Sequence, residues 1–130
     1  MSDLDDVAVE AAGDAMVTVD RAGTITSWNP AAERLLGHPT ADAVGQTLAL
    51  IIPPEYRAHH VAAFHRAMDT GTLAHEGGPA RVEATSAAGE KLALVFTLGL
   101  LTDAGGGTTG AVAVLRPVGK PLSFIEAGEQ

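Results

Sequence analysis

One segment, residues 51–71 with the sequence IIPPEYRAHHVAAFHRAMDTG, constrains the fold and function of this 130-residue chain more than any other. It predicts a helix over 54–70, because Pro54 suits a first helical position, where no N–H donor is needed. Gly71 suits the left-handed position just beyond the end of a helix. The helical repeat collects apolar side chains and one histidine on a single face: Tyr56, His60, Ala63, Phe64 and Ala67.

Of the three histidines in this helix, only His60 falls on the apolar face; His59 and His65 fall on the other side or its flanks. Ala63 and Ala67, next to His60, leave room for a flat ligand. A neutral imidazole in an apolar cleft is what an iron porphyrin requires as an axial ligand. A lone histidine on an apolar face is more often a packed core residue, so the ligand role of His60 depends on evidence from the rest of the chain.

Composition excludes several classes of function. The net charge of −8 argues against binding to nucleic acid and to anionic membrane surfaces. The chain has no cysteine, which excludes disulfides, thiolate-bound metals and cysteinyl photoadducts. The acidic start MSDLDDVAVE has no signal-peptide pattern, and apolar runs such as 48–52 are far too short to span a bilayer. We therefore expect a cytoplasmic protein.

The order of predicted elements indicates an α+β fold with a five-stranded antiparallel sheet, and with short helices and one long helix on one face. The main domain is expected over 14–118, after an acidic helix or cap (1–13) and before a C-terminal tail (119–130). The expected strands cover 15–19, 24–28, 80–87, 91–101 and 111–115, and the shorter helical segments cover 3–12, 31–36 and 40–44.

No catalytic constellation is found, and we do not expect an enzyme. The pattern G-x-G-x-x-G is matched by Gly105, Gly107 and Gly110. A dinucleotide site needs a helix after this pattern, whereas the segment that follows is β-branched and alternating, as in a strand. His38 in a turn and His75 in a loop are expected to be solvated polar residues.

Four segments carry a resemblance to PAS domains. They are DAMVTVDRAGTITSWNPAAERLLG at 14–37, AVGQTLALIIP at 43–53, AAGEKLALVFTLGLL at 87–101 and GAVAVLRPV at 110–118. The resemblance covers nearly the whole chain and implies the PAS fold.

Within that family the chain resembles the haem-binding oxygen sensors of the FixL class, and no gap is needed between the first strand and the long apolar strand. The resemblance places the axial histidine at His60, in the pattern R-x-x-H that begins at Arg57, and a propionate-binding arginine at Arg66. It implies b-type haem as the cofactor. Phe96 and Leu98, on one face of the long strand, would form the distal wall.

The sequence departs from the FixL pattern at two positions. The second propionate-binding histidine falls on Ala74, with His75 one residue away. The distal arginine falls on Ala80, with Arg81 one residue away, and one residue in a strand reverses the face of the side chain. An apolar distal wall favours CO, NO or redox sensing over tight O₂ binding. A bulge near 77–79 would instead bring Arg81 inward. The nine candidate cofactor-binding residues are therefore Tyr56, His60, Ala63, Phe64, Arg66, His75, Arg81, Phe96 and Leu98.

The leading interpretation is therefore a haem-binding sensor module that detects O₂, CO, NO or redox state and signals through a homodimer or a separate partner. One alternative is a PAS domain that binds another apolar or aromatic ligand, such as a flavin or fatty acid. Another is a ligand-free dimerisation module, because the strand 91–101 carries apolar residues on both faces.

Overall fold

The computed structural model describes residues 13–73 and 80–118. Its centre is one five-stranded antiparallel sheet with the strand order β2-β1-β5-β4-β3, which confirms the expected fold class. The strands are β1 (Ala15–Asp20), β2 (Ile25–Trp28), β3 (Ala80–Thr85), β4 (Lys91–Thr102) and β5 (Thr108–Pro117). The two edge strands, β2 and β3, come from opposite halves of the chain.

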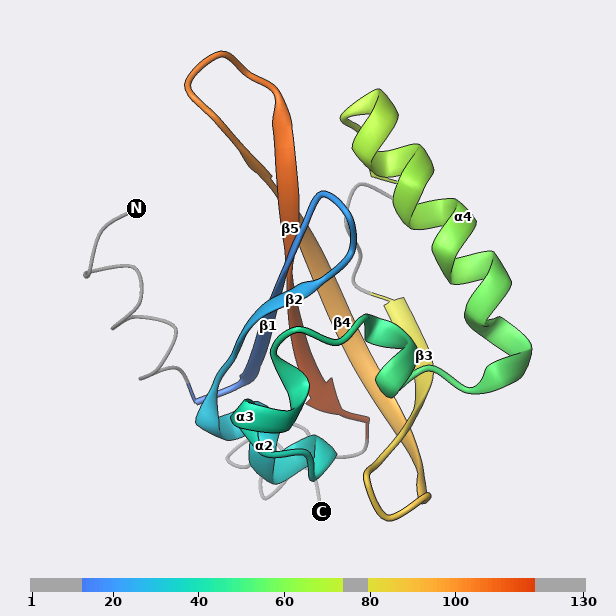
Figure 1. The fold of residues 1–130 in the computed structure, drawn as a ribbon. Helices are drawn as coiled ribbons and strands as arrows, with labels where there is room; N and C mark the ends of the chain where they lie inside the picture. Colours follow the sequence, from blue (N-terminus) through green and yellow to red (C-terminus); the bar gives the residue numbers. More distant parts are fainter. Residues whose placement is uncertain (1–12, 74–79, 119–130) are drawn as a thin grey trace, which may run out of the picture.

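The helical segments connect β2 to β3. They are α2 (Pro30–Leu36), α3 (Thr40–Ala43), the 3-10 turn η1 (Leu48–Leu50) and α4 (Pro54–Thr70). Figure 1 shows α2 and α3 together near one end of the sheet, while α4 runs alongside the β3 side. Within the described ranges, no helix is long and apolar enough to cross a bilayer.

The core lies between these helices and the inner face of the sheet. Strand register places Val17 opposite Ala113, and Ala113 opposite Leu98, so that these side chains share that face. Trp28 and Leu36 are fully buried beside them. Much of this core is therefore built from small and medium-sized aliphatic side chains.

Helix α2 begins at a buried cap that also joins it to β1. The side-chain oxygen Oδ1 of Asn29 accepts hydrogen bonds from the backbone N–H groups of Ala32 and Met16, both at 2.9 Å. Pro30 occupies the first helical turn, and Gly37 ends the helix with a φ of 86°. Asn29 therefore caps the start of α2, and Gly37 ends it.

Helix α4 is held mainly at its two ends. At its N-terminal end, the backbone N–H of Thr85 in β3 donates to the carbonyl of Ile51, at 2.8 Å. At its C-terminal end, Arg21 Nη1 donates to the carbonyls of Met68 and Thr108, both at 2.9 Å. Ala67 and Met68 are the buried residues of this helix. Its middle therefore stands away from the sheet.

Some helix and strand boundaries in the structure differ from those predicted from the sequence. The long helix was predicted correctly at 54–70, whereas the last strand is longer than expected, because its pairing with β4 extends from Thr108 to Pro117. The strand predicted over 80–87 ends at Thr85, where a turn begins, and the 3-10 turn at 48–50 was not anticipated. The helix predicted over 3–12 lies outside the described residues.

Candidate functional site: two cavities beside α4

A cavity of about 540 Å³ fills the space between the middle of α4 and the sheet. Most of its walls are apolar. From the helix it is lined by Tyr56, His59, His60, Ala63, Phe64 and Ala67. From the sheet it is lined chiefly by Val82, Leu94, Phe96, Leu98, Ala113 and Leu115. We call it the larger cavity.

Small side chains explain why this space stays open. Ala63 and Ala67 face it from α4, and Ala113 faces it from the centre of the sheet. A close-packed interior would fill these positions with larger aliphatic groups. Since hydrogen bonds fix the segment just before α4 and the carbonyl of Met68 near its end, the helix is not free to collapse onto the sheet.

His60 is a half-buried polar group in the helical wall of the larger cavity. Its ring stacks on Phe64, with 6.5 Å between ring centroids and an interplanar angle of 25°. Burial lowers the pKa of His60, and the neighbouring charge of His59 lowers it further. The imidazole is therefore held in its neutral form, in which one ring nitrogen has a free lone pair.

Seven of the nine predicted cofactor-binding residues line this cavity, six of them on its helical and distal walls and Arg81 at its rim. His60, Ala63 and Phe64 are half-buried, and Tyr56 lies at the mouth with an exposed fraction of 49%. Phe96 and Leu98 face the helix from β4, on the side expected for a distal wall.

The remaining three predicted residues are Arg66, His75 and Arg81, and neither arginine lies on these two walls. Arg81 is exposed on the edge strand β3 and borders the cavity at its rim. The register from Ala80 opposite Phe96 to Arg81 opposite Val95 is regular, whereas the bulge considered near 77–79 lies outside the described residues. Arg66 is exposed and lines neither cavity. His75 lies outside the described residues.

Two histidines differ from expectation. His59 was predicted to lie off the apolar face, yet it borders the larger cavity while remaining exposed. The middle of α4 lies away from the sheet, so the mouth of the cavity extends to the side of the helix that carries His59. His38 was predicted to be solvated. Instead it is half-buried against Trp28, with ring centroids 6.2 Å apart, and its Nε2 is buried without a hydrogen-bond partner among the described residues.

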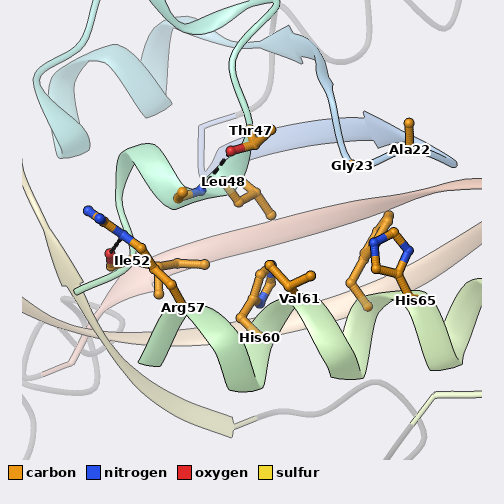
Figure 2. A pocket seen from close by; sticks show the side chains of 11 residues that line it. Ala22, Gly23, Thr47, Leu48, Ile52, Arg57, His60, Val61 and His65 are labelled. Atoms are coloured by element: carbon orange, nitrogen blue, oxygen red, sulfur yellow. Dashed lines mark hydrogen bonds between the residues drawn. The ribbon is translucent and has the colours of Figure 1, made fainter. Parts of the chain in front are cut away.

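A smaller cavity of about 220 Å³ lies on the other flank of α4. Figure 2 shows Arg57, His60, Val61 and His65 rising from the helix towards Leu48 and the β1–β2 turn. Sequence reasoning missed this cavity. The available signal was the spacing of Arg57, Val61 and His65 by four residues, which marks a second stripe on the same helix.

Comparison with known proteins agrees with this architecture. The family model described as "PAS fold" matches residues 4–118. The crystal structure of a PAS domain from Colwellia psychrerythraea is similar, with a TM-score of 0.76 and 19% identity, over 91% of this chain and 97% of that one. A light-oxygen-voltage domain studied with a flavin analogue has a TM-score of 0.69 and 16% identity, over 95% and 92%. At these identities the likeness concerns the fold.

A shorter match comes from the signal transduction histidine-protein kinase AtoS of Escherichia coli strain K12. It is 38% identical over 48 residues, which are 37% of this chain. The match spans only 8% of the kinase.

Proposed function

Because this chain belongs to the PAS fold family, whose model matches residues 4–118, and is thus a sensory module, we propose that its larger cavity binds b-type haem. In this proposal His60 is the axial ligand, and the module senses a diatomic gas (O₂, CO or NO) or redox state. The observation that carries the proposal is a half-buried histidine, kept neutral by burial, in the wall of an apolar cavity of about 540 Å³.

The residues that line the larger cavity are chemically suited to haem. A neutral imidazole is the form that ligates iron, and the cavity volume lies within the range of cofactor sites, roughly 300–1,000 Å³. Aliphatic and aromatic walls suit the porphyrin faces. Arg81 and His59 at the rim are placed to meet acidic substituents at an open edge, whereas the role assigned to Arg66 by resemblance stays a prediction.

Bound haem would supply an iron centre that takes up a diatomic gas or changes oxidation state. Phe96 and Leu98 would exclude water from the side opposite His60 and would offer a gas dispersion contacts but no hydrogen bond. Such a wall favours CO or NO over O₂. In this proposal the role is binding, with no catalytic step, and the output passes through a second copy or a separate partner.

The competing ligand is a flavin or another flat, apolar molecule. The similar light-oxygen-voltage domain studied with a flavin analogue supports this alternative, as does the apolar lining of the cavity. A flavin here would act without a cysteinyl adduct, since the chain contains no cysteine.

The first prediction tests the cofactor directly. The full chain, expressed with adequate haem supply, should show a Soret band, and His60→Gln should abolish or strongly reduce it. His65→Gln is the matched control, because His65 is on the same helix but borders only the smaller cavity. The control should retain the band.

Two outcomes would contradict the proposal. A colourless protein that takes up no added haemin would exclude haem, and a flavin spectrum would establish the alternative. Loss of the Soret band in His59→Gln but not in His60→Gln would make His59, at the cavity mouth, the ligand instead.

A further inference from the structure

The smaller cavity has no role in the proposed function, although it shares a wall with the larger one. Leu48, Ile52, His60 and Phe64 line both cavities, so the stacked pair of rings forms part of the wall between them. The smaller cavity opens between α4, η1 and the β1–β2 turn (Figure 2). Any occupant would therefore contact the back of the His60–Phe64 pair.

The size and lining of the smaller cavity limit what it can hold. Its volume of about 220 Å³ is below the usual range for cofactor pockets, roughly 300–1,000 Å³. Leu48, Val61 and Phe64 give it apolar walls. Phe64 closes one side against the turn, where a Cβ added at Gly23 would lie 3.5 Å from its ring. A small organic molecule fits this space, whereas a porphyrin does not.

Apart from the Thr47 hydroxyl, which accepts a hydrogen bond from the backbone N–H of Ala49 at 3.3 Å, the polar side chains around the smaller cavity carry nitrogen groups. Arg57 uses its Nε to donate to the carbonyl of Ile52, at 2.9 Å, and its two Nη groups have no partner among the described residues. His60 likewise has no hydrogen-bond partner within the described part of the chain. His65 lies further along the same wall. Among the described residues that line this cavity, none is acidic.

We propose that the smaller cavity binds a short organic monocarboxylate as a second ligand of this PAS domain. The carboxylate is held between the guanidinium of Arg57 and the ring of His60, and the apolar body packs against Leu48, Val61 and Phe64. Hydrogen bonds in which the donor or the acceptor is ionised are about twice as strong as those between neutral groups.

Binding at the smaller cavity does not depend on haem, but its consequence for His60 does rest on the proposed function. A metal-bound histidine usually donates its second ring N–H to a carboxylate, a carbonyl or water, which tunes the metal. The described chain provides no such acceptor for His60. A bound carboxylate would provide it and would couple the two cavities.

The second prediction tests this site in the full chain without added haem. Hexanoate, titrated while amide signals are followed by heteronuclear NMR, should give saturable shifts at Ala22, Ala49 and Val61, which line or adjoin the smaller cavity. Hexanamide, the neutral analogue, should bind at least about tenfold more weakly, since it lacks the charge-assisted bonds. Arg57→Gln should weaken hexanoate binding by a similar factor.

Arg66→Gln is the matched control, because Arg66 is an exposed arginine on the same helix that lines neither cavity. It should change hexanoate affinity by less than about twofold. Should Arg57→Gln lose its dispersed spectrum, Arg57→Lys replaces it and should still weaken binding, because a lysine lacks the planar fork.

Three results would overturn the proposal. They are no saturation with hexanoate, an equal loss of affinity in the two arginine variants, and shifts confined to Leu94 and Leu98 of the larger cavity. Because haem is absent from these titrations, failure here leaves the haem proposal intact. A missing Soret band would likewise leave this site intact.

Discussion

At the scale of single residues, His60 is the titratable side chain that lines both cavities. Its ring forms part of the wall of both cavities and is stacked on Phe64. Burial is the main reason that its pKa lies below the ordinary value for histidine, and the charge of His59 is the second. The folded protein therefore resists protonation of this ring.

The third prediction follows from that pKa. Between the lowered native pKa and the unfolded value of about 6.5, the unfolded chain binds more protons than the native chain. The free energy of unfolding must therefore fall as the pH drops through this window. His60→Gln removes the titrating group, so its stability, measured by urea unfolding from about pH 8 to about pH 5, should fall less than that of the wild type.

His65→Gln is again the control, since His65 is an exposed histidine one turn further along α4. This variant keeps His60, so its stability should fall with decreasing pH as that of the wild type does. Parallel losses of stability in the wild type and in His60→Gln would contradict the lowered pKa.

At the same scale, sequence reasoning found His60 but misplaced two other histidines. Helical spacing identified His60, because the pattern depends only on the local repeat. The contact of His38 with Trp28 joins a residue beyond the end of α2 to a strand ten residues earlier. No local pattern predicts such a contact. The position of His59 depended on how far α4 stands from the sheet, which is a tertiary property.

At the scale of elements, the ends of helices were predictable and their distances from the sheet were not. Pro54 and Gly71 mark α4 by local backbone chemistry, and Asn29 with Gly37 does the same for α2. The gap beneath α4 instead results from anchors far apart in the sequence, such as the bond from Arg21 to the carbonyl of Met68. The larger cavity therefore became visible only in the assembled fold.

The fourth prediction concerns the packing of β5 between β1 and β4. A Cβ added at Gly110 would collide with the backbone carbonyl oxygen of Val19 in β1. Gly110→Ala should therefore force the strands apart and cost about 2–3 kcal/mol of stability in a urea unfolding experiment. The collision involves backbone, so a rotamer change cannot relieve it.

Gly105→Ala in the β4–β5 loop is the matched substitution. A Cβ at Gly105 would meet Asp103 Oδ1 at an ordinary 3.6 Å. Its effect should stay within about 0.5 kcal/mol. Equal stabilities of the two variants would show that β1 and β5 lie further apart than described.

At the scale of the whole molecule, the domain combines a packed hydrophobic core on the sheet with an unfilled cavity between α4 and the sheet. The buried hydrophobic side chains form one continuous cluster that includes Leu94 and Leu115 at the larger cavity, whereas Phe64, Phe96 and Leu98 beside them remain only partly buried. Apolar area that stays accessible contributes less to folding than buried area. Ligand binding and stability should therefore compete for the same volume.

The fifth prediction tests this competition with two substitutions of the same chemical kind at adjacent positions. Ala63 is half-buried and faces the larger cavity, while its neighbour Ala62 is exposed and lines neither cavity. Ala63→Leu places additional carbon atoms into the space and should stabilise the ligand-free chain by about 1–2 kcal/mol, or a few degrees in Tm. It should also weaken haemin uptake by at least about tenfold.

Ala62→Leu makes the same change in helix propensity but adds its carbon atoms to solvent, so it should alter neither quantity appreciably. Thermal unfolding without ligand and haemin titration of both variants separate the two effects. If Ala63→Leu gained stability and kept full haemin affinity, haemin would bind elsewhere than beneath α4. If it lost stability, the space would already be closed in solution, and the small residues of α4 would serve packing and not a ligand.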